Sequence, residues 1–213
     1  MNEVIHESIK VILLGETYVG KTCLINVYYN NKFEDKMDPT LSPLCLRKSI
    51  EINGLKFYIQ IWDTAGEEKF RCINKIFIKD SQIVIFVYDI TRKSTFSELP
   101  FWVDYVEKFI GKETAIYGII GNKIDLFDKE EETNPLNPKE EFDLVNKQEA
   151  EKFANEIGAL FCETSAKDNA PGFSEFINKL VENYIREKSI DNLQKEVVHL
   201  KSSKKEKKKC CSS

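Results

Sequence analysis

Apolar and polar residues follow one another along the chain in blocks that predict strands separated by helices. Short runs rich in β-branched residues predict buried strands, and longer segments with apolar residues at helical spacing predict helices. The strand-like runs are residues 8–14, 44–53, 55–62, 82–89, 115–121 and 159–162. The helical segments are residues 20–29, 68–79, 94–109, 147–157 and 172–187. Strands that alternate with helices favour an α/β fold, a mostly parallel sheet with helices on both faces.

Two neighbouring strand-like runs depart from this alternation. Residues 44–53 and 55–62 meet at Asn53-Gly54, a dipeptide typical of tight β-hairpins. A hairpin adds one antiparallel strand at the edge of the sheet. The pattern therefore predicts a six-stranded, mostly parallel sheet with one antiparallel edge strand.

Composition fits one globular domain with modest extensions. The chain has 213 residues, 42% hydrophobic and 31% charged, with a formal net charge of −4 that does not favour nucleic-acid binding. It has no apolar run long enough to span a bilayer and no signal-peptide pattern at its N-terminus, so we expect a cytosolic protein with reduced cysteines. We expect no stable oligomer. Cys23, Cys45, Cys72 and Cys162 are expected to be small core residues.

Two polar segments interrupt the pattern. Residues 127–143 are acidic and contain two prolines, which indicates an insertion in a surface loop, either without a selected role or binding a partner. Residues 188–213 are polar and basic, as in a flexible tail. We therefore expect one domain over residues 1–187 followed by this tail.

A glycine-rich loop after the first strand predicts phosphate binding. Backbone N–H groups must point inward around a phosphate, which requires glycine where side chains would block the approach. Lys21 would then reach the β- and γ-phosphates, and the Thr22 hydroxyl would bind Mg²⁺. The loop opens a helix, whose N-terminus favours anions. The motif G-x-x-x-x-G-K-[ST] is matched by Gly15-Glu16-Thr17-Tyr18-Val19-Gly20-Lys21-Thr22.

The base is indicated by Asn122-Lys123-Ile124-Asp125, which ends the apolar run 115–121. Ligands of open α/β sheets bind at this end of the strands. The Asp125 carboxylate can accept two hydrogen bonds from guanine N1 and N2, which adenine does not offer. The motif therefore indicates GTP and GDP. An ATP-dependent kinase with the same phosphate loop is disfavoured, and a binding competition between GTP and ATP separates the two.

A second acidic motif predicts the magnesium site. Asp63-Thr64-Ala65-Gly66 follows a strand, so Asp63 is placed to hold Mg²⁺ through water. The Gly66 N–H can meet the γ-phosphate, and the Thr40 hydroxyl can complete the magnesium shell. Mg²⁺ is therefore the expected cofactor, with GTP and GDP as substrate and product.

Together and in this order, these motifs resemble the Ras superfamily of small GTPases over residues 8–186, which implies the P-loop NTPase fold. Glu163-Thr164-Ser165-Ala166-Lys167 is similar to the family's last base-contacting loop, with the Ala166 N–H on the guanine oxygen and Lys167 near the base. Phe33 stands where the family places an aromatic ring beside the purine. The resemblance implies a nucleotide-binding set of Gly15, Thr17, Tyr18, Val19, Gly20, Lys21, Thr22, Cys23, Phe33, Thr40, Gly66, Asn122, Lys123, Asp125, Ser165, Ala166 and Lys167. It implies Thr22, Thr40 and Asp63 as metal ligands and Lys21, Thr40, Gly66 and Glu67 as catalytic residues.

Within the superfamily the chain most resembles Rab proteins, through IWDTAGEE, KFRCI, YDIT and a C-terminal dicysteine. The resemblance implies a switch in vesicle traffic whose partners are an exchange factor, a GTPase-activating protein, effectors and an escort or GDI-type carrier. In Rab proteins a glycine and a phenylalanine follow the threonine that corresponds to Thr40. In this sequence Ser42 and Cys45 replace them. Trp62 and Phe77 still supply two of the three aromatic residues that Rab effectors commonly read.

Glu67 stands where the family has the glutamine that orients the attacking water. An ionised Glu offers only acceptors and adds negative charge beside a developing anion. We therefore expect slow intrinsic GTP hydrolysis. An alternative is a GTP-binding module with little or no turnover, which acts as a constitutively GTP-bound scaffold.

The C-terminal residues predict a lipid anchor. Five lysines between Lys204 and Lys209 precede Cys210-Cys211-Ser212-Ser213. The ending is similar to Rab termini with geranylgeranyl groups on Cys210 and Cys211, and it also fits a C-a-a-X motif with one farnesyl on Cys210. We expect a lipid-anchored protein on the cytoplasmic face of an intracellular membrane, in exchange with the cytosol.

Overall fold

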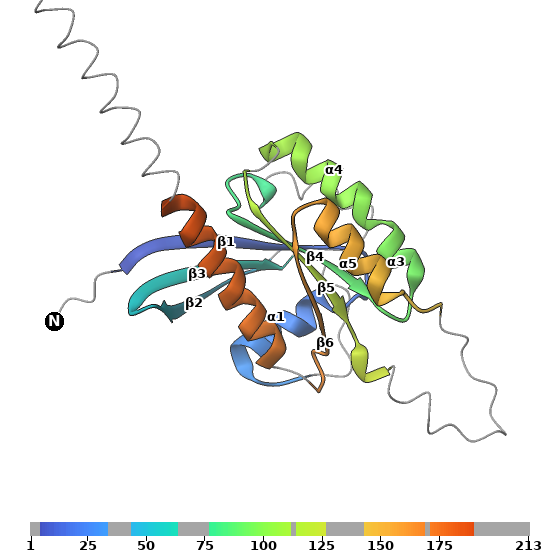
Figure 1. The fold of residues 1–213 in the computed structure, drawn as a ribbon. Helices are drawn as coiled ribbons and strands as arrows, with labels where there is room; N and C mark the ends of the chain where they lie inside the picture. The colour runs from blue at the N-terminus through green and yellow to red at the C-terminus, as the bar shows by residue number, and fades with distance from the viewer. Residues whose placement is uncertain are drawn as a thin grey trace, which may run out of the picture.

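The computed structural model describes residues 5–33, 44–63, 77–111, 114–126, 143–168 and 171–189. Its six strands form one sheet in the order β2-β3-β1-β4-β5-β6 (Figure 1). Only the β2–β3 pair is antiparallel, so the predicted α/β sheet with one antiparallel edge strand is confirmed. The strands are β1 (Ile5–Leu14), β2 (Leu44–Ile52), β3 (Leu55–Asp63), β4 (Ile83–Asp89), β5 (Ile116–Asn122) and β6 (Leu160–Thr164).

Helices cover both faces of the sheet (Figure 1). One face carries α1 and a C-terminal helix over residues 171–189, and the other carries α3, α4 and α5. The bounds are α1 (Lys21–Asn30), α3 (Lys93–Ser97), α4 (Leu99–Ile110), a 3₁₀ turn η2 (Ile124–Leu126) and α5 (Lys147–Glu156). None of the helices in these ranges combines the length and the apolar character that crossing a bilayer requires.

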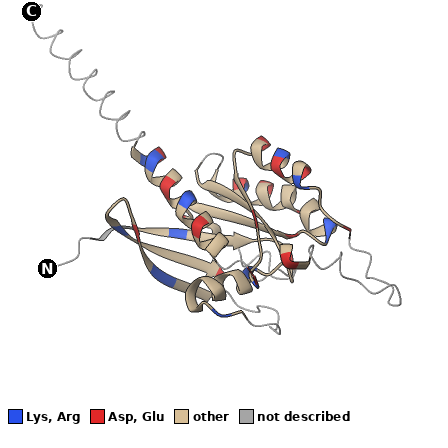
Figure 2. Ribbon diagram, turned by 60° about the horizontal axis from the view of Figure 1, so that its bottom comes forward, with Lys and Arg blue, Asp and Glu red and all other residues tan. Residues whose placement is uncertain are grey.

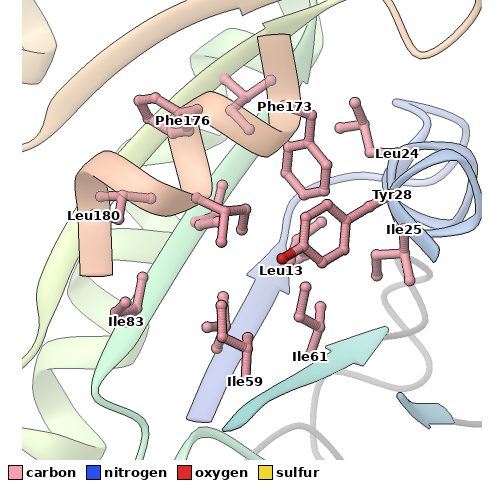
Figure 3. Packing of buried hydrophobic residues seen from close by; sticks show 14 of the residues in the cluster. Leu13, Leu24, Ile25, Tyr28, Ile59, Ile61, Ile83, Phe173, Phe176 and Leu180 are labelled. Atoms are coloured by element: carbon pink, nitrogen blue, oxygen red, sulfur yellow. The ribbon is translucent and has the colours of Figure 1, made fainter. Parts of the chain in front are cut away.

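The core beneath α1 and the C-terminal helix fixes the start of α1 against the sheet. Tyr28 of α1 meets Phe173 edge to face, with ring centroids 5.8 Å apart (Figure 3). Leu13 of β1, two residues before the phosphate loop, is fully buried in the same cluster. A Cβ at Gly118 would lie 3.0 Å from the Phe176 ring, so this strand position must be small for the C-terminal helix to pack. The phosphate loop thus joins two rigid elements.

The opposite core differs from the prediction in one place. The single helix predicted over 94–109 is two helices, α3 and α4, which meet at Glu98. Pro100 lies in the first turn of α4. Proline has no N–H to donate to the carbonyl four residues earlier, so a continuous helix loses a hydrogen bond there. The break brings Phe96 of α3 against Tyr88 of β4, with ring centroids 5.1 Å apart.

Other predictions had mixed outcomes. Cys45 is exposed on β2, so the prediction that it belongs to the core is wrong, because alternate residues of this edge strand face solvent. Cys23 and Cys162 are partly buried. Cys72, most of the helix predicted over 68–79 and most of the acidic segment 127–143 lie outside the described residues.

Charged residues lie along the helices and on the strands at the β2 side of the sheet (Figure 2). Asp89, at the last position of β4, is the one charged residue in β4 and β5. It is buried, with 1% of its surface exposed. A buried charge must be paired or hydrogen-bonded, so we expect polar partners around Asp89 at the end of β4.

Candidate nucleotide-binding site

The predicted site residues follow the carboxyl ends of the parallel strands. The phosphate loop follows β1, Asp63 ends β3, Asn122 ends β5 and Thr164 ends β6. Carboxyl ends of parallel strands share one edge of the sheet, where ligands of this fold class bind. The sheet therefore brings motifs that are more than a hundred residues apart in sequence to one edge.

Two glycines of the phosphate loop are required by close backbone contacts. A Cβ on Gly15 (φ +145°) would lie 2.1 Å from the carbonyl oxygen of Val87 in β4. A Cβ on Gly20 (φ +95°) would lie 2.3 Å from Nδ2 of Asn122. Both distances are far below contact, and both φ values lie in the region that favours glycine. These two positions therefore hold the loop against the neighbouring strands.

The loop curls around the side chain of Lys21, the first residue of α1. Lys21 Nζ donates hydrogen bonds to the carbonyl oxygens of Gly15 (2.7 Å) and Glu16 (2.8 Å). The side chain is 5% exposed. Burial lowers the pKa of Lys21 from 10.5 to about 8, against the opposing influence of Asp63 and Glu16. A buried cation held inside a loop of backbone amides is suited to bind an anion.

The magnesium residues that the structure describes are in contact. Thr22 Oγ1 donates a hydrogen bond to Asp63 Oδ2 at 2.7 Å, and Asp63 is 2% exposed. A hydroxyl and a carboxylate are hard oxygen ligands, and Mg²⁺ typically takes one or two protein groups besides phosphates and water. No group of three or more His, Cys, Asp or Glu side chains suited to a metal occurs in the described ranges. Thr40, Gly66 and Glu67 lie outside the described residues.

Asn122 connects the phosphate loop to the base-contacting loop. Its Nδ2 donates to the Val19 carbonyl at 2.8 Å, and its Oδ1 accepts from the Ala166 N–H at 3.1 Å. The side chain is 1% exposed. Buried hydrogen bonds in a low-dielectric setting are costly to break, so Asn122 is a structural tie between the two ends of the site.

Ser165 orients Asp125. The Ser165 hydroxyl donates to Asp125 Oδ1 at 2.6 Å. Ser165 Oγ also accepts hydrogen bonds from the backbone N–H groups of Lys167 and Asp168, both at 3.0 Å. Because its Oγ already accepts two N–H groups, the hydroxyl proton is directed to the carboxylate. Nearby, Lys167 Nζ lies 5.7 Å from the centre of the Phe33 ring, so the two residues expected beside the base are neighbours.

The comparisons with known proteins agree with this arrangement. The Ras family model matches residues 10–186. The chain is 40% identical over 188 residues to Ras-related protein Rab-21 of Homo sapiens, covering 88% of this chain and 77% of that protein. The dog (Canis lupus familiaris) Rab-21 is also 40% identical, with 88% and 78% covered. Mouse (Mus musculus) Rab-12 is 34% identical over 190 residues, with 89% and 72% covered. This chain belongs to the Rab family of small GTPases.

The Rab resemblance and the P-loop GTPase fold predicted from the motifs are thereby confirmed. Ras-family GTPases generally bind GTP and GDP with Mg²⁺. The roles of the individual residues remain predictions. Cys23, included in the predicted set, follows Thr22 on α1 and is partly buried, and burial raises the pKa of its thiol.

In this Rab protein, sequence reasoning missed the network around Asp89. Asp89 Oδ1 accepts the N–H and hydroxyl of Thr91 at 3.0 and 2.7 Å. Its Oδ2 meets Arg92 Nε at 3.0 Å and Lys123 Nζ at 2.7 Å. Burial alone would raise the pKa of Asp89, but the hydrogen bonds from Lys123 and Thr91 outweigh it and lower the pKa. The sequence signal for this network was Asp89 itself, a single acidic residue at the end of an otherwise apolar strand.

The lowered pKa of Lys21 predicts a pH dependence of GDP binding. Anionic phosphates favour the charged ammonium, so the pKa of Lys21 rises when GDP binds. Below pH 8 Lys21 is charged in both states, whereas above pH 8 binding requires uptake of a proton. We expect GDP affinity to fall by up to about tenfold per pH unit above pH 8. Titrations of labelled GDP between pH 7 and 9.5 measure this dependence.

Lys21→Arg is the matched control, because arginine stays charged throughout this range. Any pH dependence that remains in that variant comes from the nucleotide or from other groups. An equal decline in wild type and Lys21→Arg would contradict the prediction.

Proposed function

We propose that this Rab-family chain is a membrane-tethered switch of vesicle traffic that binds GTP and GDP with Mg²⁺ and hydrolyses GTP slowly without a partner. The observation that carries the proposal is the convergence of three groups at one sheet edge: the loop around Lys21, the Thr22–Asp63 pair, and the Ser165–Asp125 pair. Asn122 ties the first to the last. Phosphate, metal and base can therefore be bound together.

In the proposed mechanism the residues of the chain bind and orient the nucleotide. Phosphoryl transfer depends on positioning and on stabilising charge. Lys21 and the loop N–H groups hold the β- and γ-phosphates, and Asp125 fixes the base. Thr22, Asp63 and Thr40 would hold Mg²⁺, which when bound neutralises charge on the phosphate oxygens. The Gly66 N–H would meet the γ-phosphate, and Glu67 would face the attacking water.

The surface proposed for effectors includes two aromatic side chains in contact. The rings of Trp62 and Phe77 have centroids 5.1 Å apart. Cys45 lies opposite Trp62 in the β2–β3 register and is exposed. Cys45 stands where Rab proteins have a phenylalanine. Its small thiol makes this surface less apolar than a surface of three aromatic rings. We infer that its effectors differ from those that read three aromatic residues. An exchange factor, a GTPase-activating protein and a GDI-type carrier complete the proposed partners.

The proposed membrane tether predicts a change of location. We expect Cys210→Ser with Cys211→Ser to move the protein from membranes to the cytosol, because the five tail lysines, at about 1 kcal/mol each near an anionic leaflet, do not replace the lipid. Stable anchoring needs lipid as well as charge. A flexible tail of roughly 25 residues would have a root-mean-square reach of about 28 Å, which would let the switch face stand clear of the membrane. Fractionation of cells expressing tagged variants measures this.

The exposed Cys45 provides the control, since Cys45→Ser removes a surface thiol and keeps the tail. Membrane association that persists in the double cysteine variant would refute the lipid anchor. Mass spectrometry of the wild-type C-terminus separates two geranylgeranyl groups from a single farnesyl.

A second function, a GTP-binding scaffold with little turnover, is favoured by Glu67 and by Thr17. It shares the same binding site and differs in the hydrolysis step. The rate of a single turnover therefore separates the two proposals.

A further inference from the structure

The guanidinium of Arg92 contacts the phosphate loop from outside. Arg92 Nη2 donates to the carbonyl oxygen of Thr17 at 3.1 Å, across 75 positions of sequence. Its Nε donates at the same time to Asp89 Oδ2 at 3.0 Å. A guanidinium has its donors in a fixed fork, so two simultaneous bonds define its position. Arg92 therefore bridges the loop and the buried acid.

The contact with Thr17 controls a neighbouring N–H. In a trans peptide the C=O of one residue and the N–H of the next point in opposite directions, and the described residues contain no cis peptide. A hydrogen bond that holds the Thr17 carbonyl outward therefore holds the Tyr18 N–H toward the other side of the loop. That side is where phosphate-binding loops present their N–H groups.

Tyr18 makes this peptide difficult to hold. Its φ is +64°, in the left-handed region that is unfavourable for a bulky side chain. The Tyr18 side chain is 63% exposed, so burial does little to compensate. The local backbone preference therefore favours rotation of the Thr17–Tyr18 peptide away from this orientation, and an outside contact is needed to prevent it.

The anchor behind Arg92 is rigid and reaches the base side of the site. Asp89 is 1% exposed and is fixed by Thr91 as well as by Arg92. Its Oδ2 is also 2.7 Å from Nζ of Lys123. Lys123 lies between Asn122 and the base-contacting Asp125 and has a φ of +73°. Charged contacts thus run from the phosphate loop through Asp89 to the base-reading segment.

We propose that Arg92 is a positioning residue for nucleotide binding, which holds the strained Thr17–Tyr18 peptide with its N–H toward the phosphates and anchors it to Asp89 and Lys123. The inference rests on the GTP-binding activity of the family and adds a residue outside the known motifs. It requires no contact between Arg92 and the nucleotide.

The first test compares ligands that differ by one phosphate. We expect Arg92→Gln to weaken GDP binding by about tenfold, as expected for loss of a charge-assisted hydrogen bond. GMP lacks the β-phosphate that such loops cradle, so its dissociation constant changes by less than about twofold to threefold. Competition against labelled GDP gives both constants. Arg186→Gln is the matched control, because Arg186 is an exposed residue of the C-terminal helix whose Nη2 donates to Asn183 Oδ1.

The second test changes the strain itself. In a Tyr18→Gly background the left-handed conformation costs little, so the same Arg92→Gln change weakens GDP binding by only about threefold or less. Equal factors in both backgrounds, or equal losses for GDP and GMP, overturn the proposal. Arg92→Lys, which can satisfy either Asp89 or Thr17 but not both, gives an intermediate GDP affinity and guards against a folding defect in Arg92→Gln. Failure of wild-type protein to bind GDP at all would instead refute the proposed function.

Discussion

Asp125→Asn is expected to lower the affinity for GDP by about a hundredfold to ten-thousandfold, because it removes the acceptor for two hydrogen bonds from guanine. The same variant is expected to bind xanthosine diphosphate more tightly than the wild type does. Xanthine carries an oxygen where guanine has its 2-amino group, so an amide donor suits it and a carboxylate repels it. The substitution is therefore expected to change the preferred base from guanine to xanthine.

The structure explains why the new amide takes the useful orientation. The Ser165 hydroxyl accepts the N–H groups of Lys167 and Asp168 and donates to Asp125 Oδ1. In Asp125→Asn this donor selects the amide oxygen, which leaves the NH₂ group at the former Oδ2 position. Adding Ser165→Ala removes the selection. The double variant is therefore expected to lose most of the gain for xanthosine diphosphate.

Equilibrium competition with GDP, xanthosine diphosphate and ADP measures these preferences. Asp168→Asn is the matched control, because it removes one negative charge from the same loop at an exposed position. A loss of all nucleotide binding in Asp125→Asn, with the fold intact, would contradict the base-reading role. An unchanged GDP affinity would contradict it as well.

The fold was predictable because its signals are local. Buried strands read as apolar runs, and Asn53-Gly54 marked the hairpin that forms the antiparallel edge. The phosphate loop and Asp125 could be predicted for the same reason, since each motif lies within a few consecutive residues. The break between α3 and α4 also has a local signal in Pro100, which the helical spacing of the surrounding apolar residues concealed.

The rest depends on contacts between distant segments. Nothing near Arg92 in the sequence indicates that its guanidinium lies on Thr17, because β1 and β4 bring them together only when they pair. Asn122 was predicted as a base-loop residue, and its hydrogen bond to Val19 likewise depends on the folded sheet. Ser165 was expected near the base, but its donor role follows only from the positions of three neighbouring atoms.

The position of Glu67 bears on the hydrolysis step. It follows β3, four residues after Asp63, and lies outside the described residues. The predicted site already places Asp63 beside Thr22 at the phosphates. If Glu67 faces the attacking water as proposed, its carboxylate adds negative charge where the transition state itself gains it. At an effective dielectric constant of about 20, two charges about 4 Å apart repel by about 4 kcal/mol.

Glu67→Gln is therefore expected to accelerate single-turnover GTP hydrolysis by about tenfold to a hundredfold, which corresponds to about 1.4 to 2.7 kcal/mol, because solvent and salt screen part of the repulsion. The substitution removes the repulsion and supplies both a donor and an acceptor for the water. Mixing GTP-loaded protein with Mg²⁺ and following phosphate release measures the rate. Glu68→Gln is the control, because it removes one negative charge from the neighbouring residue but not the proposed contact with the attacking water. We expect it to leave the rate within about twofold of wild type. A rate that is unchanged or lower in Glu67→Gln means that Glu67 is not the obstacle to hydrolysis, and that it acts as a base or does not face the water.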